Sequence, residues 1–226
     1  GRELTFKAER IEGFDGPIRI DLDGLPPGFT SSAPLEIEAG QASAVAVVYA
    51  APDAQDPPAA LDGAVQVTAS AVVAGTRLVH HLGTLGDLQL GAPPKLTVMI
   101  LPAADHAQGM TNAPGQPLEL TLTPGQTLTA RVRAVRNDFA GRIELGNEDS
   151  GRNLPHGVYV DNIGLNGLLI VEGQTEREFF VTASRIAQPG VRRFHLRARG
   201  DDGQASPFVT LRVLPPSQVA TRSGRE

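Results

Sequence analysis

Apolar and polar residues alternate through much of the chain, with the two-residue period of a β-strand that has one buried face. In the segment 18–23, Ile18, Ile20 and Leu22 share one side, and the charged residues between them share the other. The same alternation recurs in residues 65–71, 193–199 and 208–213. This pattern predicts antiparallel strands that pack one face on a core and expose the other.

Helices are not expected. The two best helical candidates, 53–61 and 105–112, are interrupted by Pro or Gly, and no segment combines a 3.6-residue apolar stripe with caps at both ends. Turn-forming pairs such as Asp23-Gly24 and Pro124-Gly125 instead recur at intervals of about ten residues. Many short strands separated by such turns predict an all-β fold of the sandwich type.

The chain contains an internal repeat. Four signals occur twice in the same order, at an offset of about 125 to 133 residues. They are a Phe-x-Gly turn before a strand (14–16 and 139–141), a Leu-Pro-x-Gly turn (25–28 and 154–157), a Gly-Gln pair (40–41 and 173–174) and a following apolar run (44–51 and 179–183). We therefore predict two tandem immunoglobulin-like antiparallel β-sandwiches of about seven strands each.

The repeat sets the expected domain boundaries. The first sandwich covers residues 1–94 and the second covers 95–216, with a long loop at 146–170 and a flexible tail at 217–226. The stretch Gly91-Ala92-Pro93-Pro94 is expected to be a short, stiff linker between them. The second copy begins with an alternating strand, 117–123, that the first copy lacks, so we expect the first strand of domain 1 to lie upstream of Gly1.

Composition narrows the function classes. The 226 residues include 25 Gly, 18 Pro and no Cys or Trp, which excludes disulfides, thiolate metal sites and cysteine nucleophiles. No apolar stretch approaches the length of a membrane span. The pI near 5.6 and the 4% aromatic content disfavour a nucleic-acid binder and weaken a sugar-binding platform. Only Tyr49 and Tyr159 add to the phenylalanines as aromatic residues.

Two blocks carry a resemblance to a known class of protein. The segment GFDGPIRIDLDGLPPGF with IEAGQ, and the block NLPHGVYVDNIGLNGLLIVEGQTEREFF, resemble bacterial immunoglobulin-like domains. Such domains accompany pre-peptidase C-terminal (PPC) domains in large secreted or surface proteins, some of which are subtilase-type proteases. The resemblance implies a sandwich fold and a spacer, adhesive or substrate-positioning role, and it supplies no catalytic residues.

The histidines offer no hydrolase site. Neither a Gly-x-Ser-x-Gly elbow nor a triad signal occurs, although Ser150 lies six residues before His156. His80 and His81 are adjacent in a predicted strand, so they face opposite sides, and we expect one to be half-buried and the other exposed. His195 falls on an arginine-rich face that we expect to be solvated. We predict no catalytic residue, cofactor or metal.

Two segments of the second repeat hold the densest polar chemistry. The residues 147–149 (Asn-Glu-Asp), with Asn153, Asp161 and Asn162, form an oxygen-rich cluster that fits either a calcium site or a structural loop. The segment 153–170 fits either a ligand or partner surface or a hairpin that extends a sheet and caps its core; we favour the structural loop and the capping hairpin.

Charge is divided unequally between the repeats. Residues 1–94 carry five Lys/Arg and twelve Asp/Glu, whereas residues 95–226 carry fifteen and thirteen. Arg193, Arg197 and Arg199 share one strand face, and Arg131 and Arg133 share another. Such a face either keeps the sheet soluble or meets an acidic glycan or acidic domain, such as domain 1 of another copy; we favour the soluble face.

Together these features predict a non-catalytic spacer and interaction module of a larger secreted, periplasmic or cell-surface bacterial protein, in which two rigid sandwiches flank a Pro-Pro hinge. Its partners would be neighbouring domains of the parent protein, and protein or polysaccharide are further candidates. The alternatives are a carbohydrate- or protein-binding module that uses residues 153–170, and an accessory domain of a secreted subtilase-type protease.

Overall fold

The computed structural model describes residues 1–103, 109–111, 116–146, 150–161 and 167–216. The fold is almost entirely β, with mainly antiparallel sheets packed in the manner of immunoglobulin-like sandwiches. The 53–61 segment forms only a short 3-10 turn, η1 (Ala59–Leu61). Within the described residues, no helix is long and apolar enough to cross a bilayer.

The first half of the chain forms two sheets, which we call the N-terminal sandwich. One sheet has the order β1-β5-β3 and the other β4-β2-β6-β7. The strands are β1 (Arg2–Lys7), β2 (Ile18–Asp23), β3 (Phe29–Ser31), β4 (Leu35–Ile37), β5 (Ser43–Ala50), β6 (Gln66–Val73) and β7 (Thr76–Thr84). The predicted alternation of β2 is confirmed, because Ile20 is buried and Ile18 and Leu22 pack against the same core.

The second half forms the C-terminal sandwich. One of its sheets has the order β14-β16-β11-β8, the other the order β13-β17-β19-β10-β9 with β18 paired to β17, and β12 and β15 form a small third sheet. The strands are β8 (Leu96–Pro102), β9 (Met110–Thr111), β10 (Glu119–Leu122), β11 (Thr127–Arg136), β12 (Ile143–Glu144), β13 (Ser150–Arg152), β14 (Val158–Asp161), β15 (Leu169–Ile170), β16 (Glu176–Ala183), β17 (Gly190–Ala198), β18 (Gln204–Ala205) and β19 (Val209–Val213).

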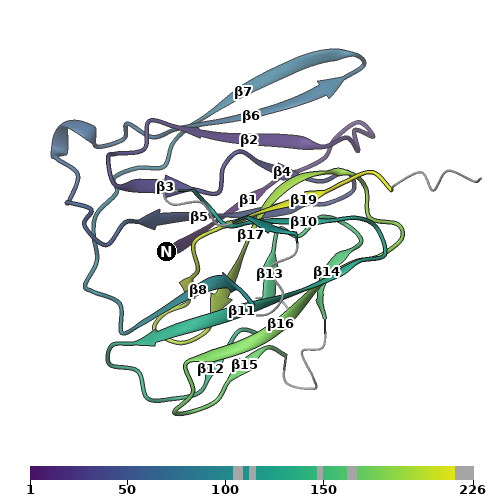
Figure 1. Cartoon of the computed structure of the whole chain (residues 1–226). Coiled ribbons are helices and arrows are strands. Elements are labelled where there is room, and N and C mark those ends of the chain that lie inside the picture. The colour runs from purple at the N-terminus through teal and green to yellow at the C-terminus, as the bar shows by residue number, and fades with distance from the viewer. Residues whose placement is uncertain (104–108, 112–115, 147–149, 162–166, 217–226) are drawn as a thin grey trace, which may run out of the picture.

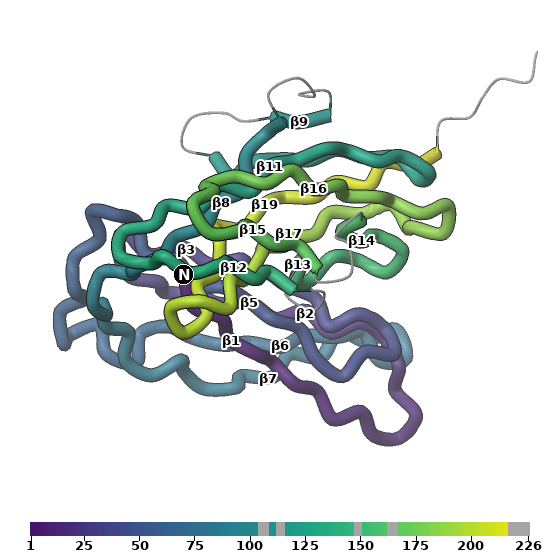
Figure 2. The backbone as a smooth tube through the Cα atoms, turned by 90° about the horizontal axis from the view of Figure 1, so that it is seen from below, coloured from purple at the N-terminus to yellow at the C-terminus, as the bar shows by residue number. Residues whose placement is uncertain are grey.

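The two sandwiches lie face to face, so that four sheets stack in layers (Figure 1). The sheet β1-β5-β3 faces the sheet that contains β17 and β19, and the N-terminus lies between the two bodies (Figure 2). The backbone N–H of Ala205 in β18 donates to the carbonyl oxygen of Gly1, next to β1 (3.2 Å). The linker at 91–94 is therefore not a free hinge, because the two sandwiches also contact each other through β1 and β5 on one side and β13, β17 and β18 on the other.

The two cores differ in size. Among the described residues, the C-terminal core contains 25 buried apolar residues, and they include Phe179, Phe194 and Leu211, each at most 1% exposed. The N-terminal core contains seven, among them Ile20 and Ile37. No residue belongs to both clusters. Each sandwich thus has a hydrophobic core of its own, and the N-terminal one is much the smaller.

The turn between β6 and β7 shows how the chain makes a tight hairpin. Ala74 and Gly75 are its two loop residues, and both have positive φ, +48° and +81°. A two-residue loop with two positive φ angles matches the twist of antiparallel strands. Gly75 adopts this conformation freely, whereas Ala74 does so at a cost of about 1 kcal/mol. The hairpin β6-β7 projects at the outer margin of the N-terminal sandwich (Figure 1).

Candidate functional site: the interface between the sandwiches

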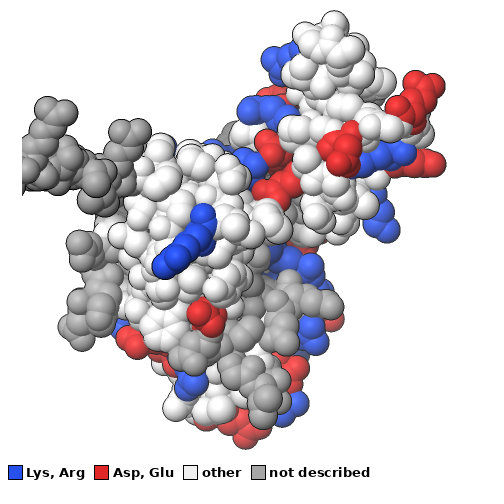
Figure 3. All heavy atoms as spheres, turned by 90° about the vertical axis from the view of Figure 1, so that its right-hand side faces the viewer, with Lys and Arg blue, Asp and Glu red and all other residues white. Residues whose placement is uncertain are grey.

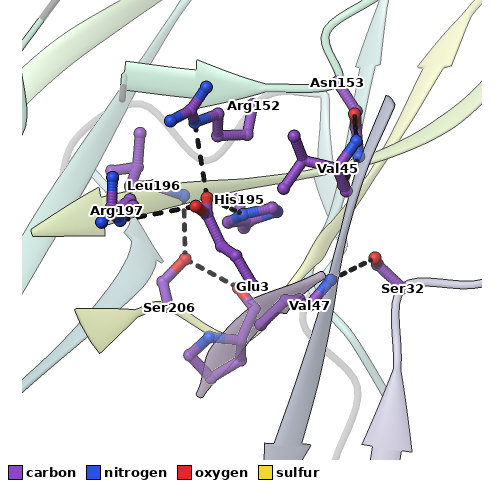
Figure 4. A network of polar contacts seen from close by, with 11 residues as sticks. Glu3, Ser32, Val45, Val47, Arg152, Asn153, His195, Leu196, Arg197 and Ser206 are labelled. Carbon is purple, nitrogen blue, oxygen red and sulfur yellow. Dashed lines mark hydrogen bonds and ion pairs between the residues drawn. The ribbon is translucent and has the colours of Figure 1, made fainter. Parts of the chain in front are cut away.

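The polar face of β17 points at the N-terminal sandwich. Phe194 and Leu196 are fully buried in the C-terminal core, so the alternate residues His195 and Arg197 face the other way. On the opposite side, Leu4 and Phe6 of β1 pack into the N-terminal core, so Glu3 faces β17. The polar faces of β1 and β17 therefore face each other, and their side chains form hydrogen bonds and ion pairs across the junction (Figure 4).

Glu3 forms the centre of this junction. Its Oε1 lies 2.8 Å from Nε2 of His195, and its two carboxylate oxygens lie 3.4 Å from the Nε atoms of Arg152 and Arg197. His195 is 0% exposed and the Glu3 side chain only 15%. Because an ionised carboxylate can only accept hydrogen bonds, Nε2 of His195 carries the proton of this contact. One acidic side chain thus joins β1 to both β13 and β17.

Asn153 makes a second link, directly to the backbone of the N-terminal sandwich. Its Oδ1 accepts a hydrogen bond from the N–H of Val45 in β5 (2.9 Å), and its Nδ2 donates to the carbonyl oxygen of the same residue. The side-chain amide therefore pairs with both backbone groups of one residue, as a neighbouring strand would. Asn153 has φ +67°, a left-handed conformation that asparagine tolerates better than most residues.

Two buried serines satisfy strand backbone beside the cluster. The hydroxyl of Ser32 accepts from the N–H of Val47 (2.9 Å), and the hydroxyl of Ser206 accepts from the N–H of Leu196 (3.1 Å). Both serines and Val47 are 0% exposed. Since an unpaired buried N–H destabilises a fold, these hydroxyls allow the two sheet faces to approach without losing backbone hydrogen bonds.

A rim of arginine contacts surrounds the cluster. Arg192 bonds to the carboxylate of Glu36 and lies 3.7 Å from that of Glu38. Arg193 donates to the carbonyl oxygen of Ala33 and stacks over the Phe208 ring, 4.9 Å from its centroid. Burial lowers the pKa of the Arg193 guanidinium, which nevertheless stays charged at neutral pH. The basic face of β17 is therefore matched to acidic and carbonyl groups of the N-terminal sandwich.

A groove runs along one side of the junction. It has a volume of about 550 Å³ and is lined from both sandwiches, by β4 and β5 on one side and by residues 151–159 on the other. Tyr159 is 46% exposed there, and the N–H of His156 points at the Glu38 carboxylate (3.2 Å). Figure 3 shows acidic and basic side chains gathered at the neck between the two bodies. The charged groups of the groove mostly neutralise one another.

The expectation that His195 is solvated is wrong. The structure places this side chain at 0% exposure because the N-terminal sandwich covers the polar face of β17. The favoured soluble-face interpretation of Arg193 and Arg197 is wrong for the same reason. The face does meet an acidic domain, but within this chain: Arg197 contacts Glu3, and Arg193 contacts the backbone of Ala33.

The other histidine expectation is wrong in part. His80 and His81 pair with successive residues of β6, as adjacent strand residues should, but both are exposed. Neither is half-buried, because both faces of β7 are exposed along the whole strand. By contrast, Arg131 and Arg133 do share a face, since both contact the Glu176 carboxylate (2.8 and 2.5 Å).

The proposed calcium cluster does not assemble among the described residues. Residues 147–149 and Asn162 lie outside them, and so does the tail 217–226. Asn153 is engaged with Val45, and Asp161 lies near the Thr182 hydroxyl (3.4 Å). Within the described part of the chain, no three His, Asp or Glu side chains gather in a way that could hold a metal.

The segment 153–170 contributes strands as well as loop. Its β14 pairs with β16 and its β15 with β12, and Val158, Leu168 and Ile170 lie in the C-terminal core. The segment therefore extends existing sheets and adds to the core, as the favoured interpretation expects, but the predicted hairpin is wrong, because β14 and β15 lie in different sheets and do not pair with each other. Residues 162–166 lie outside the described part, so the alternative of a partner surface stays a prediction for them.

Sequence reasoning did not single out Glu3 or Arg152, and it assigned Asn153 to a different role. One signal pointed toward the interface: a strand face with basic residues in the second repeat, together with an excess of acidic residues in the first. The pairings themselves span between 108 and 192 positions. No local pattern encodes contacts at such separations.

Comparison with known proteins adds little beyond the fold. No family model and no curated protein sequence matches the chain. Among solved structures, it is similar to fibronectin(III)-like modules of CbhA from Clostridium thermocellum, with 14% identity and a TM-score of 0.27, over 100% of this chain and 92% of that one. It is also similar to a protein from Corynebacterium diphtheriae described as membrane-anchored, with 9% identity and a TM-score of 0.24, over 95% of this chain and 56% of that one. Neither likeness carries an argument about function.

Proposed function

We propose that the chain is a non-catalytic structural module of a larger bacterial protein, in which two sandwiches locked face to face hold neighbouring domains at a fixed relative orientation. The observation that carries the proposal is the buried junction around Glu3 and His195. A flexible spacer would leave such faces solvated, whereas this junction aligns specific donors and acceptors from both sandwiches. Each pairing depends on orientation, so together they oppose rotation of one sandwich against the other.

The proposal includes a location outside the cytoplasm, in the secreted, periplasmic or cell-surface space. The resemblance of the turn motifs at 13–29 and 153–180 to bacterial immunoglobulin-like domains supports it. An association with PPC domains, or with a subtilase-type protease, is the corresponding expectation for the parent protein. The parent gene distinguishes these roles: further repeats favour the spacer, whereas an adjoining protease domain favours the accessory role.

The experiment measures rigidity directly. The chain has no cysteine, so cysteines introduced at the exposed positions Asp62 and Glu172 would be the only sites that a nitroxide label can modify. These two positions lie in opposite sandwiches. Double electron–electron resonance should give one narrow distance distribution. The same pair of labels in a chain that also carries Glu3→Ala and Asn153→Ala should give a broad one. A broad distribution in the otherwise unchanged chain would contradict the proposal.

A binding role in the groove is a second candidate, favoured by the exposed ring of Tyr159 among the lining residues. Aromatic side chains with one wet face are common at sites for sugars and proteins. A glycan array probed with the unchanged chain and with Tyr159→Ala tests it. Binding that the substitution removes would support this role, and absence of any binding would count against the sugar-binding form.

A further inference from the structure

Two further hollows adjoin the groove on the side of the N-terminal sandwich. One has a volume of about 290 Å³ and lies at the junction, where Arg192 and Arg193 of β17 line it together with β4. The other has a volume of about 740 Å³ and lies on the outer face of β2 and β6. Glu36 lines the groove and both hollows, so the three are continuous. We call this continuous depression, which reaches from Ser70 in β6 to Tyr159 in β14, the trough.

Both sandwiches build the trough. Strands β2, β4, β5 and β6 contribute from the N-terminal sandwich, and residues 151–159 and 191–193 contribute from the C-terminal one. Two of these residues also join the sandwiches, since Asn153 bonds to the backbone of β5 and Arg192 bonds to Glu36 of β4. A ligand that fills the trough therefore contacts both sandwiches, and its affinity depends on their fixed relative orientation.

The charges of the trough are nearly balanced. Arg19 forms an ion pair with Asp21 (2.7 Å), and Arg192 contacts the carboxylates of both Glu36 and Glu38. A polyanion would be attracted by an excess of guanidinium groups, and a polycation by an excess of carboxylates. The described lining residues offer neither large excess, since they comprise five arginines and four carboxylates: Arg19, Arg77, Arg152, Arg192, Arg193, Asp21, Asp23, Glu36 and Glu38.

The trough retains unused hydrogen-bonding capacity. Arg19 donates to Asp21 through Nε and Nη2, which leaves its Nη1 without a partner among the described residues. The side chains of Gln41, Ser43 and His156 are exposed in the groove and form no hydrogen bond within the described part of the chain. Donors and acceptors at defined positions, without a net charge, suit the hydroxyl groups of a neutral sugar.

Aromatic and apolar side chains are sparse along the trough. Tyr159 supplies a ring that is 46% exposed, and an aromatic ring with one wet face offers a surface on which a sugar ring packs. Val72 and Val191 are also exposed, but each lines a different hollow. A peptide is usually anchored by several apolar side chains in adjoining pockets, which such isolated residues do not provide. The lining therefore favours a sugar chain over a peptide.

We propose that the trough binds a neutral, linear polysaccharide, one segment of which lies along both sandwiches from β6 to β14. Hydroxyl groups of successive sugars bond to the paired charged groups and to Gln41, Ser43 and His156, and one sugar packs on Tyr159. This binding rests on the rigid junction proposed above, because a changed angle between the sandwiches would interrupt the trough at Glu36. The module then attaches its parent protein to a polysaccharide as well as holding the neighbouring domains.

Affinity electrophoresis, in gels that each contain one soluble polysaccharide, tests the class of ligand. The unchanged chain should be retarded by at least one neutral polymer among mixed-linkage β-glucan, arabinoxylan, glucomannan and dextran, and less by the anionic polymers alginate and polygalacturonate. Isothermal titration with two-sugar and six-sugar fragments of the retarding polymer should show about tenfold tighter binding of the longer one, because it contacts more than one hollow. Retardation by the anionic polymers alone, or by none of these polymers, would overturn the proposal.

Substitutions in the two sandwiches locate the site. Arg19→Ala and Tyr159→Ala should each weaken binding of the six-sugar fragment by about tenfold, because each removes a hydrogen-bonding or packing contact with a sugar. The matched controls lie outside the trough: Arg142→Ala breaks the exposed ion pair with Glu144, and Val135→Ala changes a 41% exposed position. Both controls should bind within about twofold of the unchanged chain. Undiminished binding by both trough variants would show that the sugar binds elsewhere.

Failure of the sugar site and failure of the rigid module give different results. A narrow distance distribution between the labels at positions 62 and 172, without retardation by any polysaccharide, would overturn the sugar site and leave the rigid module intact. A broad distribution, with equal affinities for the two-sugar and six-sugar fragments, would contradict both. Peptides selected from a phage-displayed library by the unchanged chain but not by Tyr159→Ala, without retardation in the gels, would assign the trough to a peptide instead.

Discussion

The Nε2 atom of His195 lies 2.8 Å from Oε1 of Glu3, so that a fully buried imidazole in β17 contacts a carboxylate in β1, 192 positions earlier in the chain. The same carboxylate contacts the guanidinium groups of Arg152 and Arg197. Charged groups at such a junction lose much of their hydration, and only close pairing compensates for that loss. The orientation of the sandwiches therefore depends on a few side chains rather than on the linker.

Replacing Glu3 tests this dependence. Glu3→Gln keeps the shape and one acceptor but removes the charge that faces the two guanidinium groups, so we expect the free energy of unfolding to fall by about 1–3 kcal/mol. Urea denaturation followed by circular dichroism measures it. The matched control is Glu172→Gln at an exposed position, which should change stability by less than about 0.5 kcal/mol. Equal effects of the two substitutions would show that the Glu3 contacts do not stabilise the fold.

A double-mutant cycle separates the Glu3–His195 pair from the rest of the cluster. His195→Gln retains a hydrogen-bond donor in a smaller side chain, and the combined variant Glu3→Gln/His195→Gln closes the cycle. Since the two residues are in contact, we expect a coupling energy of about 0.5–3 kcal/mol from the four unfolding curves. Simple additivity of the single effects would contradict a direct interaction.

Strand β17 shows which features of the structure could be predicted from the sequence and which could not. The alternation at 193–199 correctly predicted a strand with Phe194 and Leu196 on the buried side. The same alternation led to a solvated His195, because a polar strand face is exposed in an isolated sandwich. Periodicity describes one sheet and says nothing about a second domain that covers it, so the interface could be seen only in three dimensions.

Asn153 offers a prediction with an internal ranking. Asn153→Ala removes both amide contacts with Val45. It also places alanine, which tolerates the left-handed conformation less well than asparagine, at φ +67°, so it should lower the free energy of unfolding by about 2–4 kcal/mol. Asn153→Gly also loses the contacts but tolerates the conformation, so it should be milder than alanine by about 1 kcal/mol. Thermal and urea unfolding of the two variants measures this difference. If Gly and Ala were equally destabilising, backbone conformation would have no part in the effect.

The calcium hypothesis for Asn153 rested on the density of oxygen ligands nearby in sequence. An Asn side chain serves equally well as a metal ligand, a turn former or a mimic of strand backbone, and residue type alone does not separate these roles. In the structure its amide faces Val45, which is 108 positions away. The β-sandwich architecture could be predicted from local sequence patterns. The site could not, because its contacts join residues more than 100 positions apart.

Two carboxylates should titrate below their ordinary range. The hydrogen bond from Arg133 holds the pKa of Glu176 below its ordinary value, with the charges of Arg131 and Arg133 adding to the effect, and the hydrogen bonds from Arg212 lower the pKa of Glu119 in the same way. A carboxylate whose pKa is lower in the folded chain than in the unfolded chain stabilises the fold at pH values above its pKa in the unfolded chain. This stabilisation is lost as the pH falls through its pKa in the folded chain. Both pairs are solvent-exposed, so their contribution to stability is small.

Carboxyl-resolved NMR between pH 2 and pH 7 checks this directly. The midpoints of Glu119 and Glu176 should lie below the ordinary value for a glutamate side chain, and Arg212→Gln should raise the midpoint of Glu119 while leaving that of Glu176 unchanged. Parallel movement of both midpoints would mean that a general charge effect, rather than the Arg212 hydrogen bonds, lowers the pKa of Glu119.

The two separate cores predict regional responses to substitution. Ile20→Ala removes a side chain that is 2% exposed in the N-terminal core, and Leu211→Ala removes one that is 0% exposed in the C-terminal core; each should cost about 2–4 kcal/mol of local stability. Hydrogen exchange followed by mass spectrometry should show faster exchange mainly in β2, β5 and β6 for Ile20→Ala, and mainly in β11, β16 and β17 for Leu211→Ala. The smaller N-terminal core implies that its amides exchange faster even in the unchanged chain. If amide exchange became faster by the same factor throughout the chain in either variant, the two sandwiches would unfold as one unit. The contacts across the junction, including the buried Glu3 cluster, would then couple the stabilities of the two cores.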